Sequence, residues 1–304
     1  MAEKLGNRRI TGTEQFYTPR KLAAELVEAA LPYLPPASET TFLEPAAGNG
    51  SFVEALGEAG AHEVIALDRY PAIMSIRQAD FLESDFAQRN LVTFTNPPFG
   101  RNNALSIPFF NHAARFSQTI CFLVPRSWRK WSVTNRLDLR FHLIHDSDVF
   151  VSYEDNAGNP IREKNGLRTC FQIWQRQDNA REKVLVPDNR LLQKCSPEEA
   201  DIAIRVFGYG CGTVLESFER KPNTTLMFLR VNSKTAAKAL PELDFSRFSE
   251  RTAYTQALAF TEINYLLNEA IYNGINDDVF FCFNGNRSHC CLFTFVRYNW
   301  YARV

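Results

Sequence analysis

The sequence predicts an α/β fold in which a mostly parallel, doubly wound sheet is followed by a small C-terminal α+β domain. Short continuous apolar runs alternate with stretches of helical periodicity in the first half of the 304 residues, as is typical of strands buried between two helical layers. A hydrophobic content of 45% with 22% charged residues is ordinary for a globular chain with a substantial core. No apolar run is long enough to span a bilayer, so no membrane partner is expected.

The first helix is expected directly after a polar N-terminal arm, residues 1–17. It begins at Thr18-Pro19, because a proline is well tolerated at the start of a helix. Apolar residues then recur at helical spacing, at Leu22, Ala23, Leu26, Val27 and Ala30. Three prolines between Pro32 and Pro36 end the helix.

The next elements are expected to alternate between strand and helix. The predicted strands are the apolar runs Thr41–Leu43, Val64–Leu67, Leu91–Thr95 and Thr119–Val124. The predicted helices between them include Phe52–Ala59 and Ile107–Phe116. Each strand ends in residues typical of turns, which favours parallel strands joined by helical crossovers.

Two further runs, Phe141–Val151 and Arg168–Gln175, flank a polar loop and predict an antiparallel pair at a sheet edge. Residues 176–200 are polar and predict a linker. The sequence thus predicts one domain over 18–180 and a small C-terminal domain over 195–304. The elements expected in the second domain are the strands Thr225–Val231, Val279–Phe283 and Cys291–Val296 and a helix near Tyr254–Tyr272.

The first motif with chemical meaning is the glycine-containing turn Glu44–Gly50, which follows the first predicted strand. Glycines at a strand-to-helix turn let the backbone approach a ligand closely. Asp68 ends the next strand, 20 residues after Gly48, where nucleotide-binding folds place a ribose-binding acid. A dinucleotide fingerprint would have glycine or alanine where Val53 stands, so a nucleoside other than NAD is favoured. The alternative is a purely structural turn.

The second motif is Asn96-Pro97-Pro98-Phe99, at the end of the Leu91–Thr95 run. An exocyclic aryl amine is a poor nucleophile because its lone pair is delocalised into the ring. The Asn96 side-chain oxygen and the Pro97 carbonyl can accept its two N–H groups and turn the lone pair toward an electrophile. The prolines stiffen the loop, and Phe99 offers a flat face for a base. The alternative is a turn with a buried aromatic residue.

The first motif follows the carboxyl end of Thr41–Leu43, and the second follows Leu91–Thr95, which is taken as the fourth strand of the complete sheet. In doubly wound sheets these ends border one crevice, where ligands bind. The two motifs are therefore expected to face each other across one pocket.

In this order the motifs resemble those of the gamma class of S-adenosylmethionine-dependent DNA adenine-N6 methyltransferases. The resemblance covers about the first 175 residues and implies a seven-stranded Rossmann-like methyltransferase sheet with a hairpin at its edge. It implies Asn96, Pro97, Pro98 and Phe99 as the catalytic motif. It assigns S-adenosylmethionine contacts to Thr18, Pro19, Glu44, Pro45, Ala46, Gly48, Gly50, Asp68, Asp80 and Phe81. It further implies direct methyl transfer to adenine in DNA; a duplex substrate would require the base to be flipped out.

A basic segment follows the predicted fifth strand and borders the same crevice. Seven Arg or Lys and one acid lie between Arg101 and Arg140. Basic residues interleaved with tryptophans suit phosphate contact and base stacking, which suggests nucleic-acid contacts at Arg126, Trp128, Arg129, Lys130 and Trp131. The alternative is a solvated basic face with the tryptophans packed inward.

The sequence leaves other substrates and classes open. An RNA purine amine or a protein glutamine amide would use the same chemistry, and a non-catalytic nucleic-acid-binding module or an NAD oxidoreductase belongs to another class. Net charge is zero, so a nucleic-acid partner must be argued from local patches. Seven cysteines without C-x-x-C spacing, and His289 beside Cys290 and Cys291 without a second ligand pair, predict reduced thiols and no metal site. Reduced thiols, with no signal peptide evident at the N-terminus, favour the cytoplasm.

Overall fold

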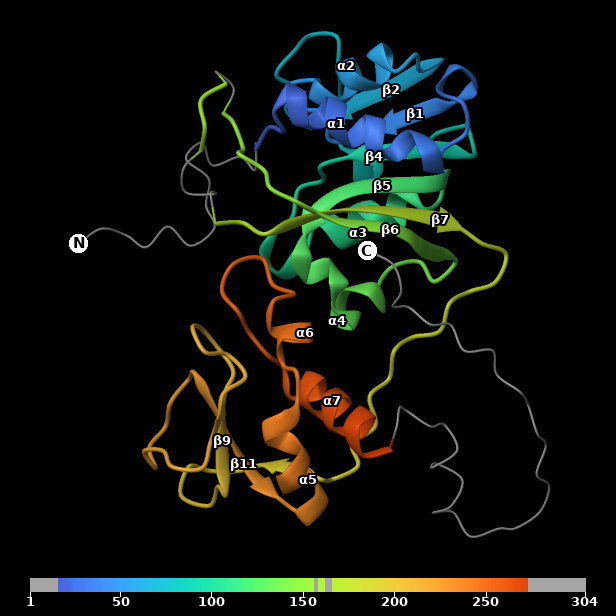
Figure 1. Cartoon of the computed structure of the whole chain (residues 1–304). Coiled ribbons are helices and arrows are strands. Elements are labelled where there is room, and N and C mark those ends of the chain that lie inside the picture. The colour runs from blue at the N-terminus through green and yellow to red at the C-terminus, as the bar shows by residue number, and fades with distance from the viewer. Residues whose placement is uncertain (1–15, 156–157, 162–165, 273–304) are drawn as a thin grey trace, which may run out of the picture.

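The computed structural model describes residues 16–155, 158–161 and 166–272, which form two lobes (Figure 1). The N-terminal lobe is built on a seven-stranded sheet of order β3-β2-β1-β4-β5-β7-β6. All neighbouring strands pair in parallel except β7, which is antiparallel to both β5 and β6. In sheet order the strands are Arg77–Gln78, Glu63–Asp68, Thr41–Glu44, Leu91–Thr95, Ser117–Pro125, Thr169–Arg176 and Phe141–Val149. This is the Rossmann-like methyltransferase sheet, which confirms the predicted fold class.

The helices cover both faces of this sheet. On one face α1 (Arg20–Ala30) and α2 (Ser51–Glu58) pack on a core that contains Phe42, Phe94 and Phe171. On the other face α3 (Ser106–Ala113) packs on a core that contains Leu43 and Phe122. Successive strand residues such as Phe42 and Leu43 thus enter opposite cores, as the pleat of a strand requires.

Shorter elements complete the described part of the N-terminal lobe. The helix α4 covers Trp131–Thr134. Single 3₁₀ turns occur at Leu31–Tyr33, Ala37–Glu39, Phe81–Glu83, Arg101–Asn103 and Arg126–Arg129. The first turn follows α1 directly and contains Pro32, where the prolines were expected to end the helix.

The loop between β6 and β7 packs back onto the N-terminal segment of the described chain. Tyr17 N–H donates to the Glu154 carbonyl at 3.0 Å, and Glu154 N–H donates to the Tyr17 carbonyl at 3.1 Å. Tyr17 is 5% exposed. The last residues of the expected polar arm are therefore part of the folded lobe, because this pairing and the burial of the tyrosine ring hold them there.

The C-terminal lobe is an α+β unit, as expected. Its antiparallel sheet has the order β10-β9-β11-β8, with β8 Leu192–Lys194, β9 Ile202–Arg205, β10 Val214–Leu215 and β11 Leu226–Val231. Its helices are α5 (Lys234–Ala239), α6 (Ser246–Ser249) and α7 (Phe260–Tyr272), with a 3₁₀ turn at Leu240–Glu242. The strands expected at 279–283 and 291–296, and the cluster at 289–291, lie outside the described residues.

No helix among the described residues is long and apolar enough to cross a membrane. The four cysteines in the same part of the chain, Cys121, Cys170, Cys195 and Cys211, are all free thiols. Over those residues, no group of three or more His, Cys, Asp and Glu side chains is arranged to hold a metal ion.

Candidate active site

A cavity of about 370 Å³ lies at the carboxyl ends of β1, β2 and β4. It brings the two sequence motifs together, as their positions after the first and fourth predicted strands required. The expected residues that line it are Pro45, Ala46, Gly48, Asp68, Asp80, Phe81, Asn96, Pro97, Pro98 and Phe99. Four other expected residues, Thr18, Pro19, Glu44 and Gly50, do not line the cavity and are described below.

Gly48 is required by a close approach of an aromatic ring. Its φ is +52°, and a Cβ built on it would lie 2.7 Å from the Tyr17 ring. Gly50, with φ of +83°, precedes the first residue of α2. A Cβ there would lie 2.8 Å from Ile73. Both glycines therefore occupy left-handed backbone conformations that keep the turn tight against the cavity.

Asp68 holds the glycine turn and the following loop in place. Its Oδ2 accepts from Gly48 N–H at 2.8 Å, and its Oδ1 accepts from Tyr70 N–H at 2.7 Å. A carboxylate has about four lone-pair sites, so these two bonds leave capacity for a ligand hydroxyl at the cavity wall. A contact with a ribose stays a prediction.

Asp80 and Phe81 form another wall of the cavity, at the 3₁₀ turn Phe81–Glu83. The Asp80 carboxylate accepts from Leu82 N–H at 3.0 Å and lies 3.7 Å from the Arg69 guanidinium. The Phe81 ring is 1% exposed and packs on Phe109 at 5.1 Å between centroids. This wall thus combines an apolar aromatic surface, formed by Phe81 and Phe109, with the carboxylate of Asp80, which its hydrogen bond holds in place.

Asn96 presents an unsatisfied acceptor beside the cavity. Its Nδ2 donates to the Phe16 carbonyl at 3.4 Å and to the Thr18 hydroxyl at 3.3 Å. A backbone carbonyl can only accept, so this contact sets the orientation of the amide. Its Oδ1 is buried and has no hydrogen-bond partner among the described residues. Thr18 thus reaches the site through Asn96, and Pro19 is the residue directly before α1.

The loop after the motif is a tight turn. Phe99 carbonyl accepts from Leu105 N–H at 3.2 Å. Gly100 has a φ of +66°, and a Cβ there would lie 2.9 Å from Leu105 N. Asn102 and Asn103 also have positive φ values, 53° and 61°. These conformations, which glycine and asparagine tolerate best, hold Phe99 at the boundary between this cavity and a second one.

Glu44 is buried beneath the turn. It is 1% exposed, and its Oε1 accepts from Ala46 N–H at 3.0 Å. Burial away from water raises the pKa of this carboxyl to about 8, against the opposing effects of the Thr95 hydroxyl and Ala46 N–H. Glu44 therefore supports the turn and does not line the cavity in the structure.

The basic segment differs from the expected nucleic-acid surface. Trp128 is fully buried, and its indole N–H donates to Ser106 Oγ at 3.2 Å. The ring has no face for a base, so the stacking expected there is wrong. Trp131 packs against Phe248 and Tyr265 of the C-terminal lobe at 4.9 and 5.3 Å. The alternative interpretation of the sequence, in which the tryptophans pack inward, is therefore correct for both Trp128 and Trp131.

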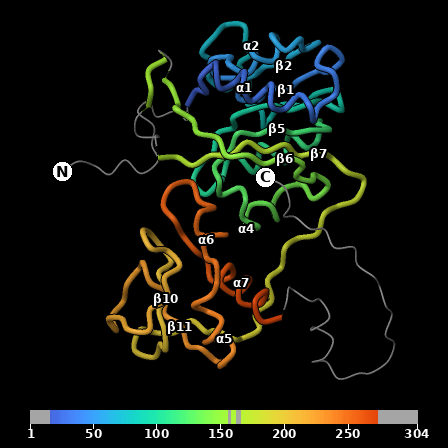
Figure 2. The backbone as a smooth tube through the Cα atoms, in the orientation of Figure 1, coloured from blue at the N-terminus to red at the C-terminus, as the bar shows by residue number. Residues whose placement is uncertain are grey.

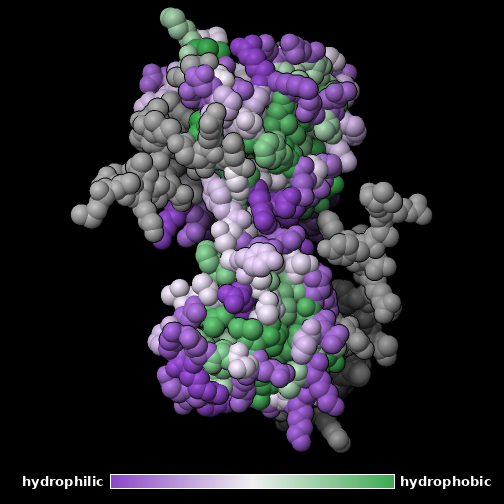
Figure 3. Space-filling view, turned by 60° about the vertical axis from the view of Figure 1, so that its left-hand side comes forward, coloured by the Kyte–Doolittle hydropathy of each residue, from purple (hydrophilic) through white to green (hydrophobic). Residues whose placement is uncertain are grey.

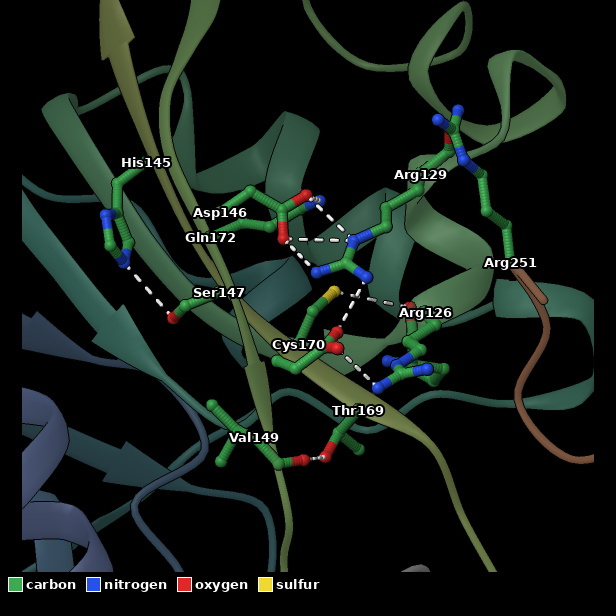
Figure 4. Close-up of polar contacts among 12 residues, drawn as sticks. Arg126, Arg129, His145, Asp146, Ser147, Val149, Thr169, Cys170, Gln172 and Arg251 are labelled. Carbon is green, nitrogen blue, oxygen red and sulfur yellow. Dashed lines mark hydrogen bonds and ion pairs between the residues drawn. The ribbon is translucent and has the colours of Figure 1, made fainter. Parts of the chain in front are cut away.

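Three basic side chains of this segment, Arg126, Arg129 and Lys130, are matched by carboxylates. Figure 4 shows Arg129 pointing toward Asp146 of β6, and its Nε lies 3.0 Å from Asp146 Oδ1. Its Nη1 lies 2.7 Å from Oδ1 of Asp148 on the same strand. Arg126 also pairs with Asp148, at 2.5 Å. Lys130 pairs with Glu262 of α7 at 3.0 Å. The acids come from β6 and α7, so the local charge count along the sequence missed them.

Several cavity residues were not anticipated from the sequence. Phe16 and Tyr17 lie within the expected polar arm, residues 1–17. Arg69 and Tyr70 directly follow Asp68, and Leu105 and Phe109 belong to the turn and helix after the catalytic motif. The signal they carry is their closeness in sequence to an assigned motif, since Phe16 and Tyr17 directly precede Thr18-Pro19.

The fold and the pocket together define a protein of the Rossmann-like methyltransferase fold. No protein-family model matches the chain, and no curated protein sequence matches it. Among solved structures it is similar to a Pyrococcus horikoshii protein described as a candidate RNA methyltransferase, at 17% identity and a TM-score of 0.42, over 54% of this chain and 87% of that one. A Thermoplasma acidophilum protein is 18% identical over 55% and 91%, also with a TM-score of 0.42.

The 23S rRNA methyltransferase ErmE is 14% identical over 54% of this chain and 71% of that one, with a TM-score of 0.38. Each likeness covers little more than half of the chain. The fold assignment rests on the strand order itself and on the single reversed strand β7.

Proposed function

We propose that this protein is an S-adenosylmethionine-dependent methyltransferase that modifies an exocyclic amine, with the N6 amine of adenine in DNA as its substrate. The observation that carries the proposal is the buried, unpartnered Oδ1 of Asn96 beside the cavity. Unsatisfied buried acceptors are rare because their desolvation is unfavourable. A substrate N–H group is the partner that this atom lacks.

The residues around the cavity suit S-adenosylmethionine. A volume of about 370 Å³ lies within the range of small-molecule sites. Asp68 offers carboxylate oxygens for hydroxyl groups, and Phe81 with Phe109 offers an apolar wall for a planar ring. When bound, this cofactor supplies the sulfonium methyl group.

The chain's own residues would orient the nucleophile. Asn96 Oδ1 accepts one N–H of the substrate amine, and the Pro97 carbonyl accepts the other. With both N–H groups held, the nitrogen lone pair is directed out of conjugation with the ring. Pro97 and Pro98 fix these oxygens before the substrate arrives, so little reorganisation is needed during transfer.

Phe99 is placed to hold the base. It lines both the cofactor-side cavity and the neighbouring one, and its loop is held by the Leu105 N–H bond. Stacking of an aromatic side chain on a base contributes about 1–3 kcal/mol. That is comparable to the few kcal/mol needed to flip a base from a duplex.

The proposal is tested by transfer of tritiated methyl groups to unmethylated genomic DNA and, in parallel, to total RNA, with digestion to nucleosides. We expect label in N6-methyladenine from DNA. Label only in an RNA purine would keep the chemistry and change the substrate, because the pocket addresses the base and not the sugar. Absence of label from both, with the cofactor bound, would refute a nucleic-acid amine as the target.

A further inference from the structure

A second cavity lies directly beside the proposed amine site. It has a volume of about 540 Å³, and it shares Phe16 and Phe99 with the cofactor-side cavity. One wall carries Lys130 and Arg136, next to α4, and the opposite wall is the segment 251–254 of the C-terminal lobe. A substrate whose amine reached Asn96 would extend into this space.

The two walls are tied to each other by hydrogen bonds. Arg168 N–H donates to the Ala253 carbonyl at 2.7 Å, and Arg251 Nη1 donates to the Arg129 carbonyl at 3.4 Å. Figure 2 shows the segment between α6 and α7 reaching up to the N-terminal lobe. In Figure 3 the surface narrows between the lobes, with mostly hydrophilic residues around the constriction. The cavity is therefore a structured part of the fold.

The lining of this cavity is basic. It includes Lys130, Arg136 and Arg251 and no aspartate or glutamate. Glu262 neutralises Lys130 at 3.0 Å. No carboxylate in the described part of the chain forms an ion pair with Arg136 or Arg251. One unneutralised guanidinium from each lobe thus faces the space beside Phe99, which favours an anionic occupant.

An aromatic loop adjoins the same wall. In the loop 207–212 every second residue is a glycine. Gly208 N–H donates to the carbonyl of Gln256 at 3.0 Å, and Gln256 lies two residues after the segment that lines the cavity. Phe207 is 50% exposed and Tyr209 is 99% exposed. A fully exposed tyrosine on a loop that is hydrogen-bonded close to a basic cavity suits the stacking of a base.

From these features we infer that the cavity between the lobes and the loop 207–212 bind one strand of nucleic acid. Arg136 and Arg251 contact phosphates next to the target nucleotide, and Tyr209 stacks on a base further along the strand. The inference rests on the proposed function for the identity of the target base. It adds the residues that hold a phosphate-linked polymer of bases, and it disfavours a protein amide, which presents neither phosphates nor stacking bases.

The test is fluorescence anisotropy with a short labelled oligonucleotide as single-stranded DNA, as duplex DNA and as RNA of the same sequence. Arg136→Gln and Arg251→Gln are each expected to weaken binding about tenfold. Each should lower the slope of log Kd against log salt concentration by about 0.7 to 0.9. The control is Lys238→Gln, which removes the same charge at an exposed position on α5. It should change neither the binding affinity nor the salt slope. The strongest binder of the three identifies the natural strand.

Tyr209 gives an independent readout. Tyr209→Ala should weaken strand binding at least fivefold, whereas Tyr209→Phe, which keeps the ring, should restore it. Unchanged melting temperature and cofactor affinity in each variant establish that the fold is intact. Wild-type affinity and salt slope in the Arg136→Gln/Arg251→Gln double variant would overturn the inference.

Binding is measured without methyl transfer, so the inference and the proposed function can fail separately. Strand binding that depends on the two arginines, without any methylation, would keep the inference and refute the function. Methylation with an unchanged KM in the double variant would keep the function and refute the inference.

Discussion

The side-chain amide of Asn96 is oriented by the carbonyl oxygen of Phe16, 3.4 Å away and 80 residues earlier in the chain. This contact leaves Oδ1 of Asn96 as the free acceptor beside the cavity. The geometry of the catalytic motif therefore depends on a segment just before α1, which is itself held by the pairing of Tyr17 with Glu154.

The close approach of Tyr17 to Gly48 predicts a strong effect of one methyl group. Gly48→Ala places a Cβ 2.7 Å from the ring at a φ of +52°, so the turn or the tyrosine must move. We expect at least a tenfold loss of cofactor affinity in calorimetry. Gly57→Ala is the control, because it lies within α2 with nothing within 4 Å of the new Cβ. It should stabilise the fold by about 0.5–1 kcal/mol with unchanged affinity. Equal affinities in the two variants would contradict the role of Gly48.

Asp68 is expected to matter for both the turn and the ligand. Asp68→Ala removes the acceptors of Gly48 and Tyr70 N–H and should weaken cofactor binding about a hundredfold, from two lost charge-assisted hydrogen bonds. Asp68→Asn keeps one good hydrogen-bond acceptor, so its loss of cofactor affinity should be smaller. Calorimetric titration measures both. A dissociation constant unchanged by Asp68→Ala would remove Asp68 from the site.

Burial of Glu44 predicts a pH-dependent penalty on stability. Because its pKa is raised from 4.5 to about 8, the folded state holds a proton that the unfolded chain releases above its own pKa. The contribution of Glu44 to the stability of the fold therefore becomes less favourable as pH rises from 4.5 to 8, and it is constant above pH 8. Glu44→Gln removes it, so its free energy of unfolding should rise relative to wild type by about 4 kcal/mol between pH 4.5 and 8.5.

Urea unfolding at a series of pH values measures this difference. The control variant is Glu58→Gln, because Glu58 is an exposed carboxylate on α2, the helix that follows the turn. Its free energy of unfolding, plotted against pH, should run parallel to that of the wild type. A parallel curve for Glu44→Gln as well would show that Glu44 titrates normally.

The ion pair between Lys130 and Glu262 predicts energetic coupling of the two lobes. The side chains are 15% and 3% exposed, Lys130 Nζ also donates to the Ala257 carbonyl, and Glu262 Oε2 accepts from Ala259 N–H. Glu262→Ala should destabilise the protein by about 3–5 kcal/mol, because it leaves a buried charge without a partner. Adding Lys130→Met should recover part of the loss. Strictly additive effects in this double-mutant cycle would mean that the pair does not couple the lobes.

The parallel strands and both motifs could be predicted from the sequence because buried strands are continuous apolar runs that end at ligand-binding turns. The strand β3, Arg77–Gln78, could not, since it has two exposed residues and no apolar pattern. Tyr17 was placed in a polar arm because its burial depends on pairing with the distant residue Glu154. Trp128 was misread because local spacing does not show that its ring enters the core with Phe110.

The central claim is that Asn96 positions a substrate amine, and one side-by-side measurement tests it most directly. Tritiated methyl transfer to DNA is measured for the wild type and for Asn96→Ala, together with the cofactor dissociation constant of each. We predict a loss of transfer of at least a hundredfold in Asn96→Ala with cofactor affinity within about twofold of wild type. Undiminished transfer in the variant would contradict the assignment of Asn96 and, with it, the proposed mechanism.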